Sequence, residues 1–161
     1  MTFQRFIIFI LLFNIAAFGL YAQEHTDAMT PEHKQWLRDK FAKQHQAIIP
    51  KVAVADMFYG CNLERNTEPT HMPIGMLVND VDKTLLAEKL IACLGEENIR
   101  SDAALKFGLK GCYRDLLSDL SEQDLADKMG LVTGAIDKLS QEERKLSFTK
   151  CVTEQAIKYL K

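Results

Sequence analysis

The chain has 161 residues, with 20 lysines and arginines against 22 aspartates and glutamates and a formal net charge of −2. This length is enough for one domain with a hydrophobic core and too short for two domains of ordinary size. Proteins that bind nucleic acids or anionic membranes rely on a strong electrostatic attraction, which the nearly balanced charge of this chain excludes. We therefore expect neither of them as a partner.

The first 22 residues, MTFQRFIIFILLFNIAAFGLYA, predict a secretory signal peptide. Arg5 precedes an apolar run, and Ala22 is the expected cleavage site. An uncleaved membrane anchor is the alternative, but the run of roughly 16 residues is shorter than the 20 or so that span a bilayer, and Asn14 interrupts it. We expect residues 23–161 to form a single helical domain, exported to the periplasm or the extracellular space, with no stable membrane anchoring after cleavage.

Two helices are predicted at the start of this domain. Thr30 and Pro31 are residue types favoured at the cap and the first position of a helix. Pro50 is expected to end or kink this helix, because proline has no backbone N–H to donate. A second helix follows over about 51–63, with Cys61 on its apolar side.

A long loop over 64–77 comes next, because this segment contains two prolines and a glycine. Binding residues often lie on such loops, and His71 and Met72 are the candidates here. The alternative is a simple connecting segment. The helical pattern returns over 78–94, where Cys93 again lies on the apolar face.

The clearest helix of the chain is predicted over 101–120. Ser101 is suited to the N-cap position, where its hydroxyl can accept a hydrogen bond from a free backbone N–H. The apolar positions recur at intervals of three and four residues, which is typical of the buried face of an amphipathic helix. These positions are Leu105, Leu109, Cys112, Leu116 and Leu120.

The remaining residues also predict helices. Ser121 begins a short helix that Gly130 is expected to close, and a brief helical piece follows over 131–139. The residues 140–143, Ser-Gln-Glu-Glu, form a capping box for a final helix that runs to Leu160. No segment alternates long enough to predict a strand. The fold class is therefore all-α, a compact disulfide-stapled bundle of about six helices.

Four cysteines behind a signal peptide predict two disulfides. No C-x-x-C pair is present, which argues against a zinc site and against redox exchange. Three pairings are possible. Positions along the helices favour Cys61 with Cys93 and Cys112 with Cys151, without excluding the other two.

No catalytic or cofactor motif is present, so we expect neither a metal nor a cofactor and predict a protein that is not an enzyme. The histidines lack the spacings of metal ligands, and no G-x-S-x-G sequence occurs. Carboxylates brought together from distant helices would be the exception, and they keep a small secreted hydrolase open as an alternative. The histidines are His25, His33, His45 and His71.

Phe107 is a candidate for partner binding, because it points away from the leucine face of its helix. Gly108 and Gly111 lie near it in a strip of small residues. The strip could form a groove for a partner with Phe107 as an aromatic anchor. Alternatively, the first or the last helix packs closely over the strip and covers Phe107.

A run of acidic residues is a second candidate surface, either a negative patch for a basic protein partner or a solvated helix face. It begins with Asp115 and Asp119 and continues with Glu122, Asp124 and Asp127.

These features favour an exported, non-enzymatic domain that binds a protein partner. It would be of inhibitor or immunity-protein type and would block a partner such as a toxin or a hydrolase. A carrier of a small apolar ligand is the first alternative. The gaps after Cys93 and Cys112 are 18 and 38 residues, the reverse of the order in four-cysteine insect odorant-binding proteins. The partner and the oligomeric state do not follow from the sequence.

Overall fold

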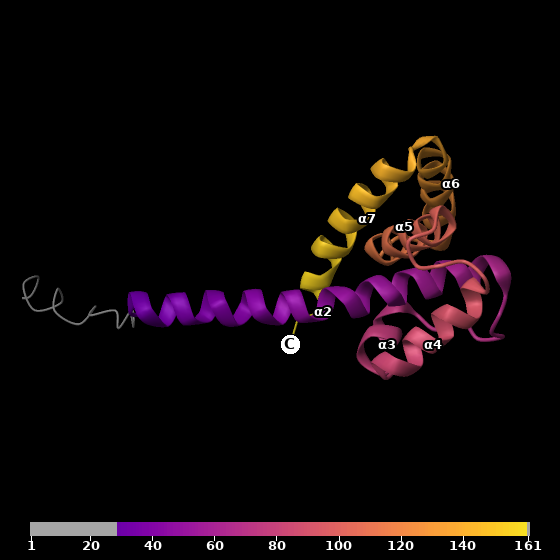
Figure 1. The fold of residues 1–161 in the computed structure, drawn as a ribbon. Coiled ribbons are helices and arrows are strands. Elements are labelled where there is room, and N and C mark those ends of the chain that lie inside the picture. The colour runs from indigo at the N-terminus through magenta and orange to yellow at the C-terminus, as the bar shows by residue number, and fades with distance from the viewer. Residues whose placement is uncertain (1–28, 161) are drawn as a thin grey trace, which may run out of the picture. The chain divides into compact units, whose positions relative to one another are not determined.

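The structure is a computed structural model that describes residues 29–160; the predicted signal peptide lies outside this range. The described residues form six α-helices and a short 3₁₀ helix and contain no strand, which confirms the predicted all-α class (Figure 1). The elements are α2 (Pro31–Arg65), α3 (Ile74–Asn79), α4 (Lys83–Leu94), α5 (Asp102–Leu116), α6 (Glu122–Lys138), α7 (Gln141–Ala156) and η1 (Ile157–Tyr159).

The chain divides into two compact units, Met1–Leu37 and Arg38–Lys161. The first unit includes the beginning of α2, where the hydroxyl of Thr30 accepts a hydrogen bond from the backbone N–H of His33 at 3.2 Å. The prediction of a helix start at Thr30 and Pro31 is thus confirmed. The second unit holds the hydrophobic core and both disulfides.

Pro50 does not end α2, which continues to Arg65, so the predicted boundary between two helices at this residue is wrong. A proline inside a helix removes one backbone hydrogen bond and destabilises it. Packing against the rest of the second unit offsets this loss. Val52 and Ala55 are fully buried within the five residues after the proline, and Nε2 of His45, five residues before it, donates to the carbonyl oxygen of Thr153 at 2.8 Å.

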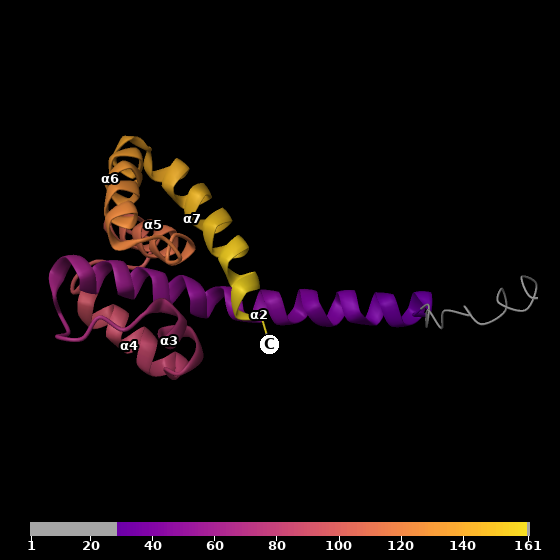
Figure 2. The same cartoon turned by 180° about the vertical axis from the view of Figure 1, so that it is seen from behind.

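Within the second unit, α3 and α4 lie on one side of the C-terminal half of α2, and α5, α6 and α7 lie on the other (Figures 1 and 2). Each side is cross-linked. Cys61–Cys93 joins α2 to α4, and Cys112–Cys151 joins α5 to α7, which confirms the favoured pairing.

The helix α5 is central to the unit, but its buried face is shorter than predicted. Ser101 caps it as expected, since its hydroxyl accepts from the backbone N–H of Ala104 at 3.1 Å. Leu105, Leu109 and Cys112 are buried. The helix ends at Leu116, and Leu116 and Leu120 are 43% and 39% exposed, because the chain turns away from the core at this point.

Glycines bring the backbone of α2 into contact with that of α5. A Cβ atom at Gly60 would lie 2.1 Å from the carbonyl oxygen of Phe107, and one at Gly111 would lie 2.3 Å from that of Asp56. Both distances are far below any van der Waals contact. Only glycine therefore allows this approach, and α2 covers the part of α5 on which Phe107 lies.

Several further boundaries differ from the prediction, including the end of the final helix, where α7 stops at Ala156 and η1 follows in place of a continuous helix to Leu160. The segment 74–79 forms the short helix α3 and residues 80–82 separate it from α4, where the sequence predicted a loop to 77 and one helix over 78–94. Gly130 does not close a helix, because α6 continues through it to Lys138. The capping box of α7 is confirmed, with Ser140 and Glu143 each accepting a hydrogen bond from the other's backbone N–H.

Candidate partner-binding groove

The structure brings together the end of the loop over 64–77 and the beginning of the acidic run, two of the three candidate regions that the sequence singled out separately. A hollow of about 140 Å³ lies where the loop before α3 meets the turn between α5 and α6. We call it the groove and define it by its lining residues. They are Tyr59 of α2, Pro73 and Ile74 at the start of α3, Arg114 and Asp115 at the end of α5, Ser118 of the turn, and Leu125 of α6.

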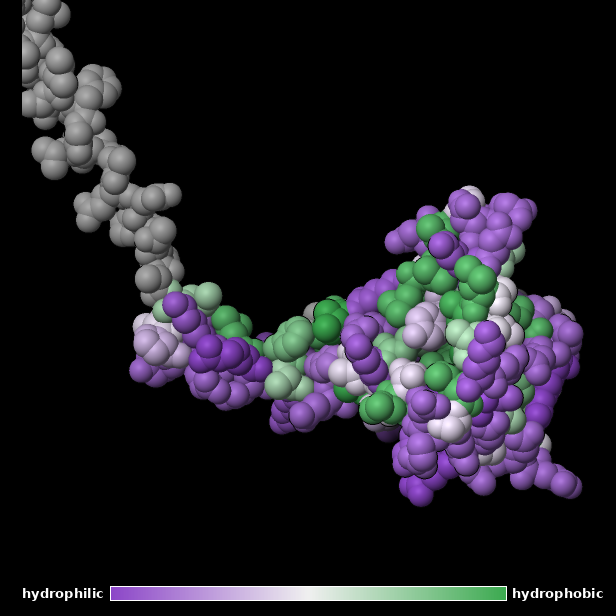
Figure 3. All heavy atoms as spheres, turned by 90° about the horizontal axis from the view of Figure 1, so that it is seen from above, coloured by the Kyte–Doolittle hydropathy of each residue, from purple (hydrophilic) through white to green (hydrophobic). Residues whose placement is uncertain are grey.

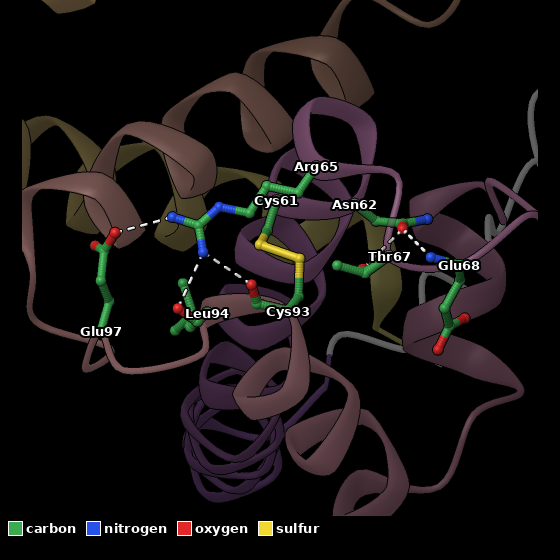
Figure 4. The surroundings of a disulfide bond; sticks show 8 residues. All are labelled: Cys61, Asn62, Arg65, Thr67, Glu68, Cys93, Leu94 and Glu97. Atoms are coloured by element: carbon green, nitrogen blue, oxygen red, sulfur yellow. Dashed lines mark hydrogen bonds and ion pairs between the residues drawn. A yellow bond between two sulfur atoms is a disulfide. The ribbon is translucent and has the colours of Figure 1, made fainter.

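The loop that leads to the groove is held at its beginning by the end of α2. Asn66 adopts the left-handed conformation, with φ of 50°, that often follows a helix. Oδ1 of Asn62 accepts hydrogen bonds from the hydroxyl of Thr67 at 3.0 Å and from the backbone N–H of Glu68 at 2.7 Å (Figure 4). These bonds fix the direction in which the chain leaves the helix.

A disulfide lies beside this anchor. Figure 4 shows the Cys61–Cys93 bridge between α2 and α4, with Arg65 reaching across to the end of α4. Its guanidinium donates to the carbonyl oxygens of Cys93 at 2.9 Å and Leu94 at 3.0 Å, and it pairs with Glu97 at 2.8 Å. Arg65 therefore supplies hydrogen bonds to carbonyls that the end of a helix leaves without partners.

Asp115 belongs to the groove and also to the interior of the unit. Its side chain is only 8% exposed. Oδ2 accepts hydrogen bonds from the hydroxyl of Tyr159 at 2.7 Å and from Nε2 of Gln155 at 2.9 Å, and Oδ1 accepts one from Lys158 at 3.2 Å. Three donors thus hold this carboxylate in one orientation at the edge of the groove.

A second acidic residue, Asp56, lies deeper and belongs to the same set of contacts. Nε2 of Gln155 donates to Oδ1 of Asp56 at 3.0 Å, so one amide group connects the two aspartates. We call Asp56, Asp115, Gln155 and Tyr159 the polar cluster. It links α2, α5, α7 and η1 behind the groove.

Burial shifts the pKa values of two of these groups. Removal from water, and then the negative charge of Asp115, raise the pKa of Asp56 well above its ordinary value, although the hydrogen bond from Gln155 acts in the opposite direction. Burial also raises the pKa of the Tyr159 hydroxyl, and its hydrogen bond to Asp115 adds to this shift. Both shifts favour the neutral forms of these side chains.

Phe107, Gly108 and Gly111 are not part of a surface, and their prediction as a partner groove is corrected. Phe107 is only 3% exposed, because α2 packs over it and the guanidinium of Arg65 lies 5.1 Å from the centre of its ring. A Cβ atom at Gly108 would lie 2.6 Å from the ring of Phe148 on α7. The alternative interpretation, a strip covered by the first and last helices, is therefore confirmed.

The acidic run divides into a buried and an exposed part. Asp115 is buried in the polar cluster and does not form a negative patch, because its carboxylate is taken up by internal donors. Asp119, Glu122, Asp124 and Asp127 are exposed beyond the groove, and we call these four residues the acidic rim.

In the loop, His71 is exposed, and Met72 is half-buried against the core. Met72 precedes Pro73, which lines the groove. The loop and the α5–α6 turn are thus brought together by the fold, although 40 or more residues separate them in the sequence.

Sequence reasoning missed three members of the polar cluster, Asp56, Gln155 and Tyr159. One signal was available for Asp56, which interrupts the apolar run Val-Ala-Val-Ala-Asp-Met-Phe. An acidic side chain that is buried among apolar residues needs a polar partner, so this interruption was a sign of a buried polar contact. Gln155 and Tyr159 carried no comparable signal.

The fold and the groove define a disulfide-stapled helical domain with a small, part-apolar recess beside an acidic surface. Among residues 29–160, no group of His, Cys, Asp and Glu could hold a metal ion, and no helix is sufficiently long and apolar to cross a bilayer. Comparison with known proteins gives no matching family model, no similar curated protein and no similar solved structure. The role of the groove is therefore inferred from its own residues.

Proposed function

We propose that this chain is an exported, non-enzymatic domain that binds a protein partner, of inhibitor or immunity-protein type, and blocks a partner such as a toxin or a hydrolase. The observation that carries the proposal is the groove, which combines the loop before α3 with the α5–α6 turn. Leu116 and Leu120 are more than one-third exposed, and they belong to the same stretch of sequence as the acidic rim. A partner with basic side chains around an apolar contact would complement this surface.

The rigidity of the frame supports binding rather than chemistry. Both walls of the groove are fixed, one by the contacts of Asn62 and the Cys61–Cys93 disulfide, and the other by the hydrogen bonds of Asp115. A preformed surface loses little conformational entropy when a partner binds. The paired acids of a hydrolase would need access to a substrate, whereas Asp56 is fully buried.

The hollows of the domain give less support to a carrier of apolar ligands. Hydrophobic residues gather on the face shown in Figure 3, over the helices of the second unit. An apolar hollow between α5, α6 and α7 holds about 190 Å³, which is below the roughly 300 Å³ at which typical ligand pockets begin. A larger hollow of about 510 Å³ combines apolar with charged and polar lining residues, and three of its six lining residues are charged. They are Ile99, Arg100, Leu105, Gln141, Glu142 and Lys145.

Capture of a partner by the oxidised protein tests the proposal. We expect one protein to be recovered in stoichiometric amount from an extract of the source. The double variant Asp119→Lys/Glu122→Lys should lose that protein, because it reverses two charges of the acidic rim. The variant Glu88→Lys reverses an exposed charge on α4 and should retain it. No captured protein, or equal capture by all three chains, would contradict the proposal.

A further inference from the structure

Two buried side-chain atoms in the described part of the chain have no hydrogen-bond partner, namely Oδ2 of Asp56 and Oε1 of Gln155. Both side chains are fully buried, and they already share one hydrogen bond, from Nε2 of Gln155 to Oδ1 of Asp56. If Asp56 were ionised, both unpartnered atoms would be acceptors without a donor. Buried polar atoms in folded proteins are nearly always partnered, so this arrangement needs an explanation.

We infer that Asp56 carries a proton at neutral pH and donates it from Oδ2 to Oε1 of Gln155. A single proton changes Oδ2 from an acceptor into a donor and thereby gives both unpartnered atoms a partner. The two side chains then form an acid–amide pair, in which the amide N–H donates to one carboxyl oxygen and the acid O–H donates to the amide oxygen. The inference does not depend on the proposed function.

The neighbouring charges place the proton on Asp56 rather than on Asp115. Asp115 of α5 accepts hydrogen bonds from Tyr159, Gln155 and the ammonium group of Lys158. Asp56 of α2 accepts only the one from Gln155, and Lys158 bonds Asp115 instead. A buried charge is tolerated when donors or an opposite charge compensate it. Asp115 has both kinds of compensation, whereas Asp56 has neither an opposite charge nor a second donor.

This acid–amide pair is a contact between α2 and α7 whose strength depends on pH. Loss of the proton leaves an uncompensated charge between the helices, and it also breaks the bond to Oε1 of Gln155. The stabilisation by the proton is complete below about pH 4, the ordinary pKa of aspartate. It decreases as the pH rises from there to the pKa of Asp56 in the folded protein, by up to about ten-fold in the folding equilibrium per pH unit.

The variant Asp56→Asn tests the inference, because its amide N–H₂ can donate where the acid O–H donates and it cannot ionise. Urea unfolding of the oxidised protein is followed from about pH 4 to about pH 8. The folding equilibrium of the wild type should fall with rising pH relative to that of Asp56→Asn. Asp119→Asn, at an exposed aspartate, should keep the wild-type dependence. An identical dependence in wild type and Asp56→Asn would overturn the inference.

A second measurement needs no variant and covers the case in which Asp56→Asn does not fold. Protein labelled with ¹³C at the aspartate carboxyl carbons is examined at neutral pH by infrared spectroscopy. We expect the C=O stretching band of one protonated carboxylic acid, buried and slow to exchange with deuterium, beside the carboxylate bands of the other aspartates. If only carboxylate bands are present, Asp56 is ionised and the inference is wrong.

Discussion

At the scale of single residues, the polar cluster shows how an environment changes the chemistry of ordinary side chains. Asp56 has an ordinary acidic side chain, yet burial in the core raises its pKa and favours its neutral form. Its partner Gln155 lies 99 residues away, so no local pattern connects them. The sequence shows that an acid interrupts an apolar run, but only the fold shows which group meets it.

Removal of the Tyr159 hydroxyl tests the contact with Asp115. Tyr159→Phe should destabilise the domain by about 1 kcal/mol, the usual contribution of one hydrogen bond. Because the pKa of Tyr159 is raised, the stabilisation by its neutral form is complete below about pH 10 and is lost as the pH rises further. The alkaline loss of stability should therefore be smaller in Tyr159→Phe, as measured by urea unfolding at several pH values.

Tyr113→Phe is the matched control, because Tyr113 is half-buried on α5 without such a bond to Asp115. It should leave the stability and its pH dependence nearly unchanged. Equal losses in the two variants would show that the Tyr159 hydroxyl makes no special contact.

Gln155→Leu removes the amide that donates to both aspartates. It leaves Oδ1 of Asp56 without a donor and the proton on Oδ2 of Asp56 without an acceptor, and it removes one of the two donors to Oδ2 of Asp115. We expect a loss of about 2 to 4 kcal/mol in the free energy of unfolding. Gln141→Leu, at an exposed glutamine of α7, should change it by less than about 0.5 kcal/mol. Urea unfolding of the oxidised proteins measures both. A loss below that of the control would contradict the cluster as described.

At the scale of helices, the sequence predicts the serine-capped beginnings of α5 and α7 but not the beginning of α4, which lies at Lys83 rather than at residue 78. Ser101 and Ser140 begin α5 and α7 as expected, because capping bonds connect residues only three apart. Helix ends were predicted at Pro50, with a kink as the alternative, and at Gly130, but α2 and α6 continue through these residues. At Pro50, packing against distant parts of the chain keeps α2 helical. At Gly130, the helix propensity of glycine is only about 1 kcal/mol less favourable than that of alanine, which is too little to end α6.

Glycine-to-alanine substitutions distinguish a glycine that a helix contact requires from one that no contact requires, because their effects on stability have opposite signs. Gly60→Ala places a methyl group 2.1 Å from the Phe107 carbonyl oxygen, and should destabilise the domain by about 3 kcal/mol or more because α2 and α5 must move apart. Gly130→Ala places a methyl group where nothing lies within 4 Å, and should stabilise α6 by about 0.5 to 1 kcal/mol. Thermal unfolding with calorimetry measures both.

The opposite signs make this pair informative. If Gly60→Ala were neutral, α2 and α5 would not touch at this point. Phe107 would then lose its cover, and its interpretation as a surface anchor would return.

At the scale of the whole molecule, the two disulfides replace part of the core that a small domain lacks. They span 32 and 39 residues of sequence. In the chain-entropy model, loops of this length contribute about 3 to 4 kcal/mol each. The cysteine pattern and helix positions favoured this pairing, whereas the meeting of the loop with the α5–α6 turn could not be predicted, because it depends on how α3 packs against α5.

Replacing Cys112 and Cys151 together by alanine should lower the free energy of unfolding by about 3 to 4 kcal/mol. The Cys61 and Cys93 pair should give a similar loss, because the closed loops differ little in length. Urea unfolding without reductant measures the losses. A loss below about 1 kcal/mol in either case would mean that packing alone holds those helices.

The most direct test of the central claim is amide hydrogen exchange of the oxidised protein with and without its captured partner. The account predicts that binding slows exchange in the loop over 66–73 and in the segment 116–127, since these two form the groove and the acidic rim. The exposed face of α4 around Glu88 should exchange as in the free protein. Protection confined to α4, or to neither of the two groove segments, would contradict the claim that this chain binds its partner through the groove.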